Sequence, residues 1–162
     1  MSDACLRPIG VFFSSFISDS CRKDGCELHL DSIRRGCLLV VDSEKYAEAK
    51  GLSGAMCDLL VFCSQSGMLV SALEFKGGGV DASRVYDQLC AGSKLAQRAG
   101  PKDTKTRFIP LLIHKGKRLH ANDYKRMNHY AVTFHGKGHK IVIERSHQSL
   151  VEIIRKHASS CE

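Results

Sequence analysis

Several features that would place this 162-residue chain in a membrane, secreted or repeat class are missing. Its longest apolar patch, Ile9–Ile17, has nine residues and is interrupted by serines, too short for a membrane span. No convincing small-residue cleavage site follows that patch. No low-complexity linker or internal repeat divides the chain. We therefore expect a single soluble, cytoplasmic domain over residues 1–162, without membrane contact.

Paired metal-binding cysteines are also lacking, although the chain has 8 cysteines. None forms a Cys-x-x-Cys pair, and four fall within segments that are predicted to be regular structure, where cysteine acts as a small apolar residue. Only Cys21, Cys26 and His29 have the spacing of metal ligands, and the sequence offers no obvious partner to complete a zinc site with them. Structural zinc is therefore disfavoured. Disulfides are disfavoured as well, because no secretion signal is recognised.

Aromatic residues make up only 7% of the chain and include no tryptophan, whereas positive charge is abundant and unevenly placed. Residues 1–81 hold 8 Lys and Arg against 11 Asp and Glu, and residues 82–162 hold 16 against 6, so the halves carry −3 and +10. A concentrated basic region is typical of a surface that binds a phosphate backbone. Because no aromatic pattern for stacking single-stranded bases is present, we expect contact with double-stranded nucleic acid.

Two apolar segments predict a hairpin that brings acids together. The segments Cys57–Cys63 and Leu69–Lys76 are rich in strand formers, and Ser64–Gly67 between them has turn residues. A hairpin centred on Ser66 places Asp58 opposite Glu74, and strand alternation puts Lys76 on the same face. Directly opposed like charges destabilise a sheet, so a positive charge must offset them.

Asp58 and Glu74-Phe75-Lys76 resemble the pattern of the PD-(D/E)xK nucleases, whose core is that of the type II restriction endonucleases. Cys57 stands where the family name has proline, at a variable position. The resemblance covers about residues 36–115. It implies that Asp58 and Glu74 are catalytic residues that hold Mg²⁺, with Mn²⁺ as a substitute, and that Lys76 orients the attacking water.

Other residues near this pattern are candidates for supporting roles. Asp42 is the first candidate for a third metal ligand, with Glu27, Asp31 and Glu44 as competitors, and a cap on the following helix is an equally good interpretation of Asp42. The glycines after Lys76 suit close approach of a substrate, which makes Gly77 and Gly78 candidate substrate-binding residues. A helix is predicted to begin at Asp81 and to continue through Ala99. The resemblance makes Gln88, Lys94 and Tyr86 on this helix further candidates for substrate contact.

The remaining elements predict an α/β fold with a central mixed β-sheet flanked by helices, like the restriction endonuclease core. Arg107–His114 is predicted as a strand parallel to an earlier one, with Pro110 favouring a bulge or an edge. A basic C-terminal part, residues 116–162, is predicted to form a hairpin around Gly136-Lys137-Gly138 and a final helix. The expected bounds of the other elements are a strand at Gly36–Asp42, a helix at Ser43–Lys50, hairpin strands at Tyr130–His135 and Lys140–Glu144, a helix at Gln148–His157, and N-terminal strands at Val11–Ile17 and Glu27–Leu30.

The leading functional hypothesis is a Mg²⁺-dependent nuclease that hydrolyses phosphodiester bonds, with double-stranded DNA as the favoured substrate. A homodimer would suit double-strand cleavage, since one site cuts one strand. The alternative is a non-catalytic nucleic-acid-binding protein or complex subunit that keeps the fold. A third hypothesis is a His-Asn-His type site built from His120, Asn128, His129, His135 and His139.

Overall fold

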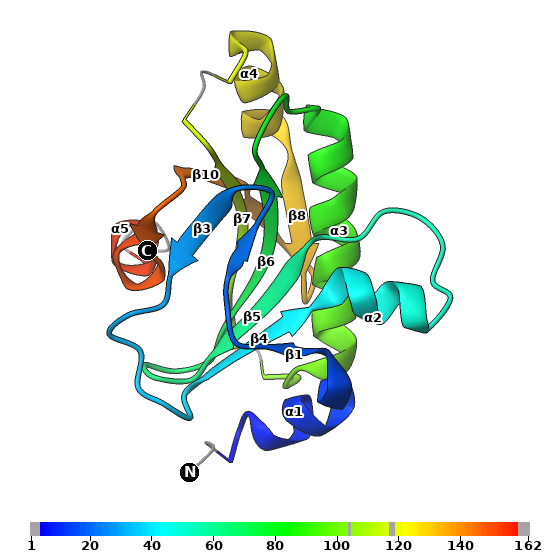
Figure 1. Cartoon of the computed structure of the whole chain (residues 1–162), viewed down its shortest axis with the longest axis vertical. Coiled ribbons are helices and arrows are strands. Elements are labelled where there is room, and N and C mark those ends of the chain that lie inside the picture. Colours follow the sequence, from blue (N-terminus) through cyan, green and yellow to red (C-terminus); the bar gives the residue numbers. More distant parts are fainter. Residues whose placement is uncertain (1–3, 104, 117–118, 159–162) are drawn as a thin grey trace.

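A mixed six-stranded sheet forms the centre of the protein, shown in a computed structural model that describes residues 4–103, 105–116 and 119–158. The strand order is β1-β4-β5-β6-β7-β10 (Figure 1). Each of the first four strands is antiparallel to its neighbour in this order, whereas β7 and β10 run parallel to β6. The strands are β1 (Ile17–Ser18), β4 (Leu38–Asp42), β5 (Leu59–Cys63), β6 (Leu69–Lys76), β7 (Arg107–His114) and β10 (Val142–Arg145).

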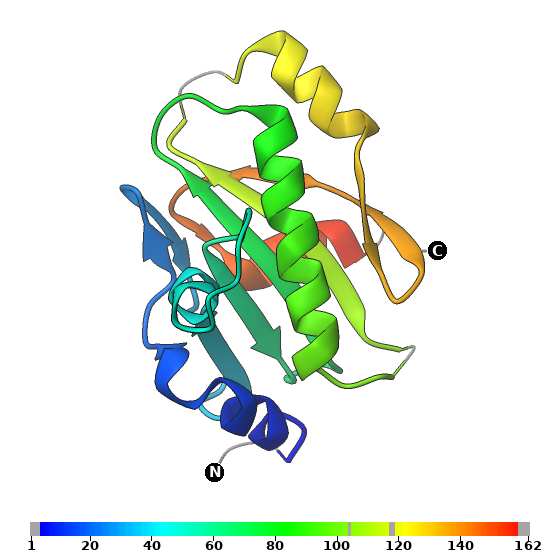
Figure 2. The same ribbon diagram turned by 90° about the vertical axis from the view of Figure 1, so that its right-hand side faces the viewer.

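Both faces of this sheet are covered, which explains why β5 and β6 are almost continuously apolar. One face packs against α3 (Ala82–Ala99), which crosses the sheet diagonally in Figure 2. Alternate side chains of β6 divide between the faces, so Ala72 contacts the α3 layer and Phe75 the opposite one. The opposite layer contains β3 (Cys26–His29) and α5 (Leu150–Ala158).

The remaining elements extend these layers. Helices α1 (Arg7–Phe13) and α2 (Ser43–Ala49), with the short 3-10 helix η1 (Ser14–Phe16), pack on the α3 side. Helix α4 (Ala121–His129) lies near the N-terminal end of α3 (Figure 1). Three short pairings complete the fold and involve β2 (Arg22–Lys23), β8 (Ala131–Phe134), β9 (Lys137–Lys140) and β11 (Gln148–Ser149): β2 pairs with β3, β11 with β3, and β8 with β9.

The predicted hairpin and its neighbours are confirmed. Leu59 pairs with Leu73 and Cys63 with Leu69, the register that sets Asp58 beside Glu74. Helix α3 follows with Asp81 as its N-cap, and β7 has the predicted bounds and pairs in parallel with β6. Pro110 lies in the half of β7 that β10 does not reach, because β10 pairs only with Leu111–His114, so this position is locally an edge.

Two predictions at the ends of the chain are wrong. The predicted strand Val11–Ile17 is replaced over most of its length by α1 and η1, because Pro8 opens a helix and Ile9 and Phe13, four residues apart, are both buried. In the C-terminal hairpin the turn is His135-Gly136, both with positive φ (47° and 77°), as a two-residue turn of type I′ requires. The partner of β8 therefore begins at Lys137, and β10 joins the central sheet instead.

Within the described residues, no helix has the length and apolarity needed to cross a membrane.

Candidate active site

A cavity of about 520 Å³ opens beside the carboxyl end of β6. Asp58, Glu74, Lys76 and Gln88 all line it, so four of the residues predicted from the sequence come together. Asp58 directly precedes β5, β6 carries Glu74 and Lys76, and α3 carries Gln88.

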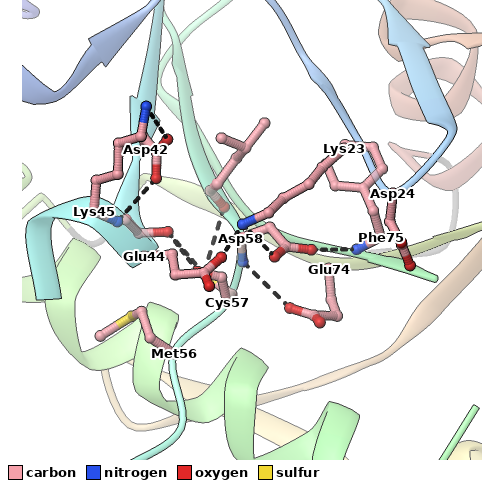
Figure 3. Close-up of polar contacts among 12 residues, drawn as sticks. Lys23, Asp24, Asp42, Glu44, Lys45, Met56, Cys57, Asp58, Glu74 and Phe75 are labelled. Atoms are coloured by element: carbon pink, nitrogen blue, oxygen red, sulfur yellow. Dashed lines mark hydrogen bonds and ion pairs between the residues drawn. The ribbon is translucent and has the colours of Figure 1, made fainter. Parts of the chain in front are cut away.

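The two carboxylates are buried and hydrogen-bonded to the backbone of each other's segment. Glu74 is 1% exposed and accepts a hydrogen bond from the Asp58 backbone N–H through Oε2 at 3.2 Å. Asp58 Oδ2 accepts a hydrogen bond from the Phe75 N–H at 2.8 Å. These reciprocal bonds fix both side chains against the hairpin, as Figure 3 shows. The pair is therefore held in place before any ligand binds.

Burial makes the ionised form of Glu74 costly. Burial, followed by the nearby Asp58 carboxylate, raises the pKa of Glu74 to about 7, although the Lys76 ammonium acts in the opposite direction. Glu74 Oε1 lies 2.6 Å from Lys76 Nζ. A buried carboxyl with a strongly shifted pKa in a cavity is typical of a functional site, since folding alone gains nothing from it.

A second lysine, Lys23 of β2, also reaches the carboxylates. Its Nζ lies 3.0 Å from Asp58 Oδ1 and forms an ion pair with Glu44 of α2 (Figure 3). Two ammonium groups, from Lys23 and Lys76, thus offset the repulsion that the hairpin register creates. Sequence reasoning missed Lys23 because no local pattern links it to Asp58, and the β2–β3 hairpin brings it there.

The position of that hairpin depends on Gly77. The Gly77 N–H donates to Asp24 Oδ2 at 2.9 Å, and a Cβ at Gly77 would overlap the Asp24 carbonyl oxygen. Close backbone approach is therefore required there, by the protein's own chain, whereas the predicted contact of Gly77 with a substrate stays a prediction. Gly78 is exposed, and a Cβ there would meet nothing within 4 Å.

A second close contact, between α3 and Cys57, fixes the position of the chain next to Asp58. A Cβ at Gly92 of α3 would overlap the sulfur of Cys57, which is fully buried. Burial raises the pKa of the Cys57 thiol to about 12, so it packs as a neutral group. Glycine at 92 thus lets α3 press on the residue before Asp58.

The other candidates lie apart from the cavity or at its wall. Asp42 caps α2 by accepting from the Lys45 N–H at 2.9 Å and does not line the cavity, whereas the competing candidate Glu44 does. Lys94 is exposed on α3 and does not line the cavity. Gln88 donates from Nε2 to the Met56 carbonyl at 3.4 Å, and its Oε1 is buried without a partner within the described structure.

Three further cationic side chains lie at the cavity or near it, at this end of the sheet. Arg84 in the first turn of α3 lines it. Arg126 of α4 donates to the Ser83 hydroxyl at 2.9 Å, next in sequence to Arg84. Lys115, just after β7, lies against Gly25 in the turn beyond Lys23. Part of the basic C-terminal half is thus placed beside the acids of the N-terminal half.

The alternative metal candidates do not gather into clusters. In the part of the chain that the structure describes, no group of three or more His, Cys, Asp or Glu side chains is arranged to hold a metal ion. Cys21 and Cys26 are buried in the apolar layer, and burial raises the pKa of both thiols. His120 caps α4 and His129 is exposed at its end, whereas His135 and His139 belong to the β8–β9 hairpin.

Comparison with known proteins adds no relative. No protein-family model matches the chain, and no curated protein or solved structure is significantly similar to it. The functional argument therefore rests on the site itself.

Proposed function

We propose that this protein is a divalent-metal-dependent nuclease of restriction endonuclease-like fold that hydrolyses phosphodiester bonds in double-stranded DNA. The observation that carries the proposal is the meeting of two buried carboxylates, Asp58 and Glu74, with Lys76 in one cavity. The order along the chain, an acid directly before one strand, an acid and a lysine on the next strand, and then a helix, resembles the PD-(D/E)xK pattern.

The side chains present suit Mg²⁺. Asp58, Glu74 and Glu44 supply carboxylate oxygens to one cavity, and Mg²⁺ prefers one or two carboxylates with waters and substrate phosphate rather than a closed protein cage. The orphaned Gln88 Oε1 is a further oxygen at the cavity wall. Bound there, Mg²⁺ would polarise a phosphoryl oxygen and lower the pKa of a bound water.

The protein's own groups would then divide the remaining work. Asp58 and Glu74 would hold the cation as ionised carboxylates, which favours loss of the Glu74 proton near neutral pH. Lys76 would leave its contact with Glu74 to orient the attacking water and balance charge on the phosphate. Arg84 and Lys23 line the same cavity and would bind the phosphates on either side of the cut bond.

Cleavage assays on plasmid, linear duplex, single-stranded DNA and RNA test the proposal. We expect duplex cutting in Mg²⁺ or Mn²⁺ and none in EDTA, and a loss of about a hundredfold or more in Asp58→Ala and Lys76→Ala. Asp42→Ala is the matched control, because that carboxylate caps α2 outside the cavity. It should keep its cutting rate and lose only about 1 kcal/mol of stability. Cutting that survives in Asp58→Ala or in EDTA would overturn the proposal.

One observation favours a second candidate, a non-catalytic nucleic-acid-binding protein. All four carboxylate oxygens of Asp58 and Glu74 already have partners, two of them lysine ammonium groups, so the pair is satisfied without a metal. Under this alternative, duplex binding persists in EDTA and no preparation cuts any of the four substrates.

A further inference from the structure

A second cavity, of about 340 Å³, lies at the other end of the sheet. Its origin is a mismatch in strand length, since β10 pairs with Leu111–His114 and leaves Arg107–Pro110 of β7 without a pairing strand on that side. Residues of β7, of the β8–β9 hairpin and of α5 line the space. The cavity is thus a product of how the sheet ends, and none of its lining residues lines the acidic cavity.

Its walls are apolar and flat. Phe108 and Phe134 stack with ring centroids 4.5 Å apart and an interplanar angle of 3°. Leu69 and Ile109 line the cavity from the sheet, and Ile154 lines it from α5. Such walls favour an apolar ring or chain over a hydrated ion.

Its rim is cationic. Lys105, Arg107 and Lys137 line the cavity, and no acidic side chain is among the described residues that do so. The guanidinium of Arg107 makes one long hydrogen bond, 3.4 Å to the Ser66 carbonyl, and so retains donors for a ligand. This charge pattern selects an anionic group at the edge of the apolar slot.

Two buried polar atoms in the lining residues lack hydrogen-bond partners within the described structure. These are Thr106 Oγ1 and His135 Nε2, and both residues line this cavity. Burying an unsatisfied polar group costs about 1 to 3 kcal/mol, so such atoms in a cavity wall indicate a site completed by a bound molecule.

We propose that this cavity is a binding site for a small amphipathic anion, an apolar ring or short chain that carries one carboxylate, sulfonate or phosphate group. The apolar part lies against Phe108, Phe134 and Ile154. The anionic group is held by Arg107 and the neighbouring lysines. This proposal is independent of the nuclease site, because it uses none of its residues.

Titration with 1-naphthoate, followed by amide NMR of the full chain, tests the site directly. We expect saturable shifts confined to the residues that line this cavity. The uncharged counterpart, 1-naphthalenemethanol, should bind about tenfold more weakly, because it lacks the charge that Arg107 contacts. Arg107→Gln should weaken naphthoate binding by about tenfold and leave the binding of the alcohol nearly unchanged.

Two further variants separate occupancy from general effects. Ile154→Trp, which fills the cavity from α5, should abolish binding of both compounds, with folding checked by thermal melting. Lys94→Gln, an exposed lysine that does not line the cavity, should change binding by less than about twofold. The proposal is overturned if the shifts lie elsewhere or do not saturate. Equal binding of acid and alcohol, or unchanged naphthoate binding in Arg107→Gln, would also overturn it.

Discussion

The two cavities lie at opposite ends of strand β6 and differ in their chemistry. At the carboxyl end of β6 the cavity contains buried acids with lysine partners, whereas near Leu69 and Arg107, the first residues of β6 and β7, it has aromatic walls and a cationic rim. Seven residues of extended strand separate them, roughly 20 Å.

The two cavities differ because different strands pair at the two ends of the sheet. The antiparallel β5–β6 register forces two acids together and creates a cost that only cations relieve. Because β10 begins only opposite Leu111, the first half of β7 has no pairing strand on that side, and the cavity lies between it, the β8–β9 hairpin and α5. One sheet therefore borders two cavities of different chemistry that share no lining residue.

The largest expected effect that separates the two ends is a pH dependence carried by Glu74. Its pKa is raised to about 7 in the folded protein from 4.5, so between these values the folded state binds more protons than the unfolded state. Stability contributed by the protonated carboxyl is therefore lost as pH rises through that window. Relative to wild type, Glu74→Gln should gain about 2.5 kcal/mol between pH 5 and pH 8.

Urea unfolding of both proteins in EDTA at the two pH values measures this difference. The comparison with Glu74→Gln cancels the titration of the histidines, which changes in the same range. An unchanged difference between wild type and variant would mean that burial does not raise the Glu74 pKa.

A pair of adjacent glycines provides the next test. Gly77→Ala should displace the β2–β3 turn and with it Lys23, because a Cβ there overlaps the Asp24 carbonyl. If the acidic cavity is catalytic, misplacement of its lining by about 1 Å costs on the order of a hundredfold in cutting rate. Gly78→Ala, one residue further along, meets nothing within 4 Å and should cut at the wild-type rate. Equal cutting rates in the two variants would show that the β2–β3 hairpin does not contribute to the active site.

Removal of Lys23 should have a smaller effect, opposite in sign for metal and for stability. Lys23→Met deletes an ammonium group 3.0 Å from Asp58, so the cavity becomes more negative. We expect Mn²⁺ to bind about tenfold more tightly by calorimetry, whereas the metal-free protein becomes less stable. Lys45→Met, which deletes the ion pair with Asp42 outside the cavity, is the control. Weaker Mn²⁺ binding in Lys23→Met would show that Lys23 does not compete for the carboxylates.

The smallest effect is expected from the apolar cavity on cleavage. Ile154→Trp fills that cavity without touching the acidic one and should alter the cutting rate by less than about twofold. A large loss of cutting in a folded Ile154→Trp protein would show that the two ends of the sheet are coupled.

The hairpin follows from the sequence because local signals agree there. Apolar runs, turn residues at Ser64–Gly67 and the pattern of alternation all favour Asp58 and Glu74 on the same face, although a two-residue slip would have kept that face as well. Helix α4 was not predicted, because Met127 is its one buried residue and a helix so exposed has no clear apolar stripe.

Long-range contacts explain what was missed in the site. Lys23 reaches Asp58 across 35 positions of sequence through the packing of a short hairpin, and Arg84 and Glu44 reach the cavity because of how α3 and α2 pack. For Asp42 the sequence leaves a third metal ligand and a helix cap open, and in the structure its carboxylate caps the helix that carries Glu44. Contacts between distant elements cannot be predicted from the residue pattern within either element alone.

We propose that Asp58 and Glu74 together hold a divalent cation, and a calorimetric titration with Mn²⁺ measures that binding without a cleavage assay. Wild type and Asp42→Asn should bind one ion with the same affinity. Asp58→Asn should bind the ion at least tenfold more weakly, because it removes one of the two buried carboxylates at the centre of the cavity. Mn²⁺ binding of equal strength in wild type and Asp58→Asn, or no binding by any of the three proteins, would contradict the account.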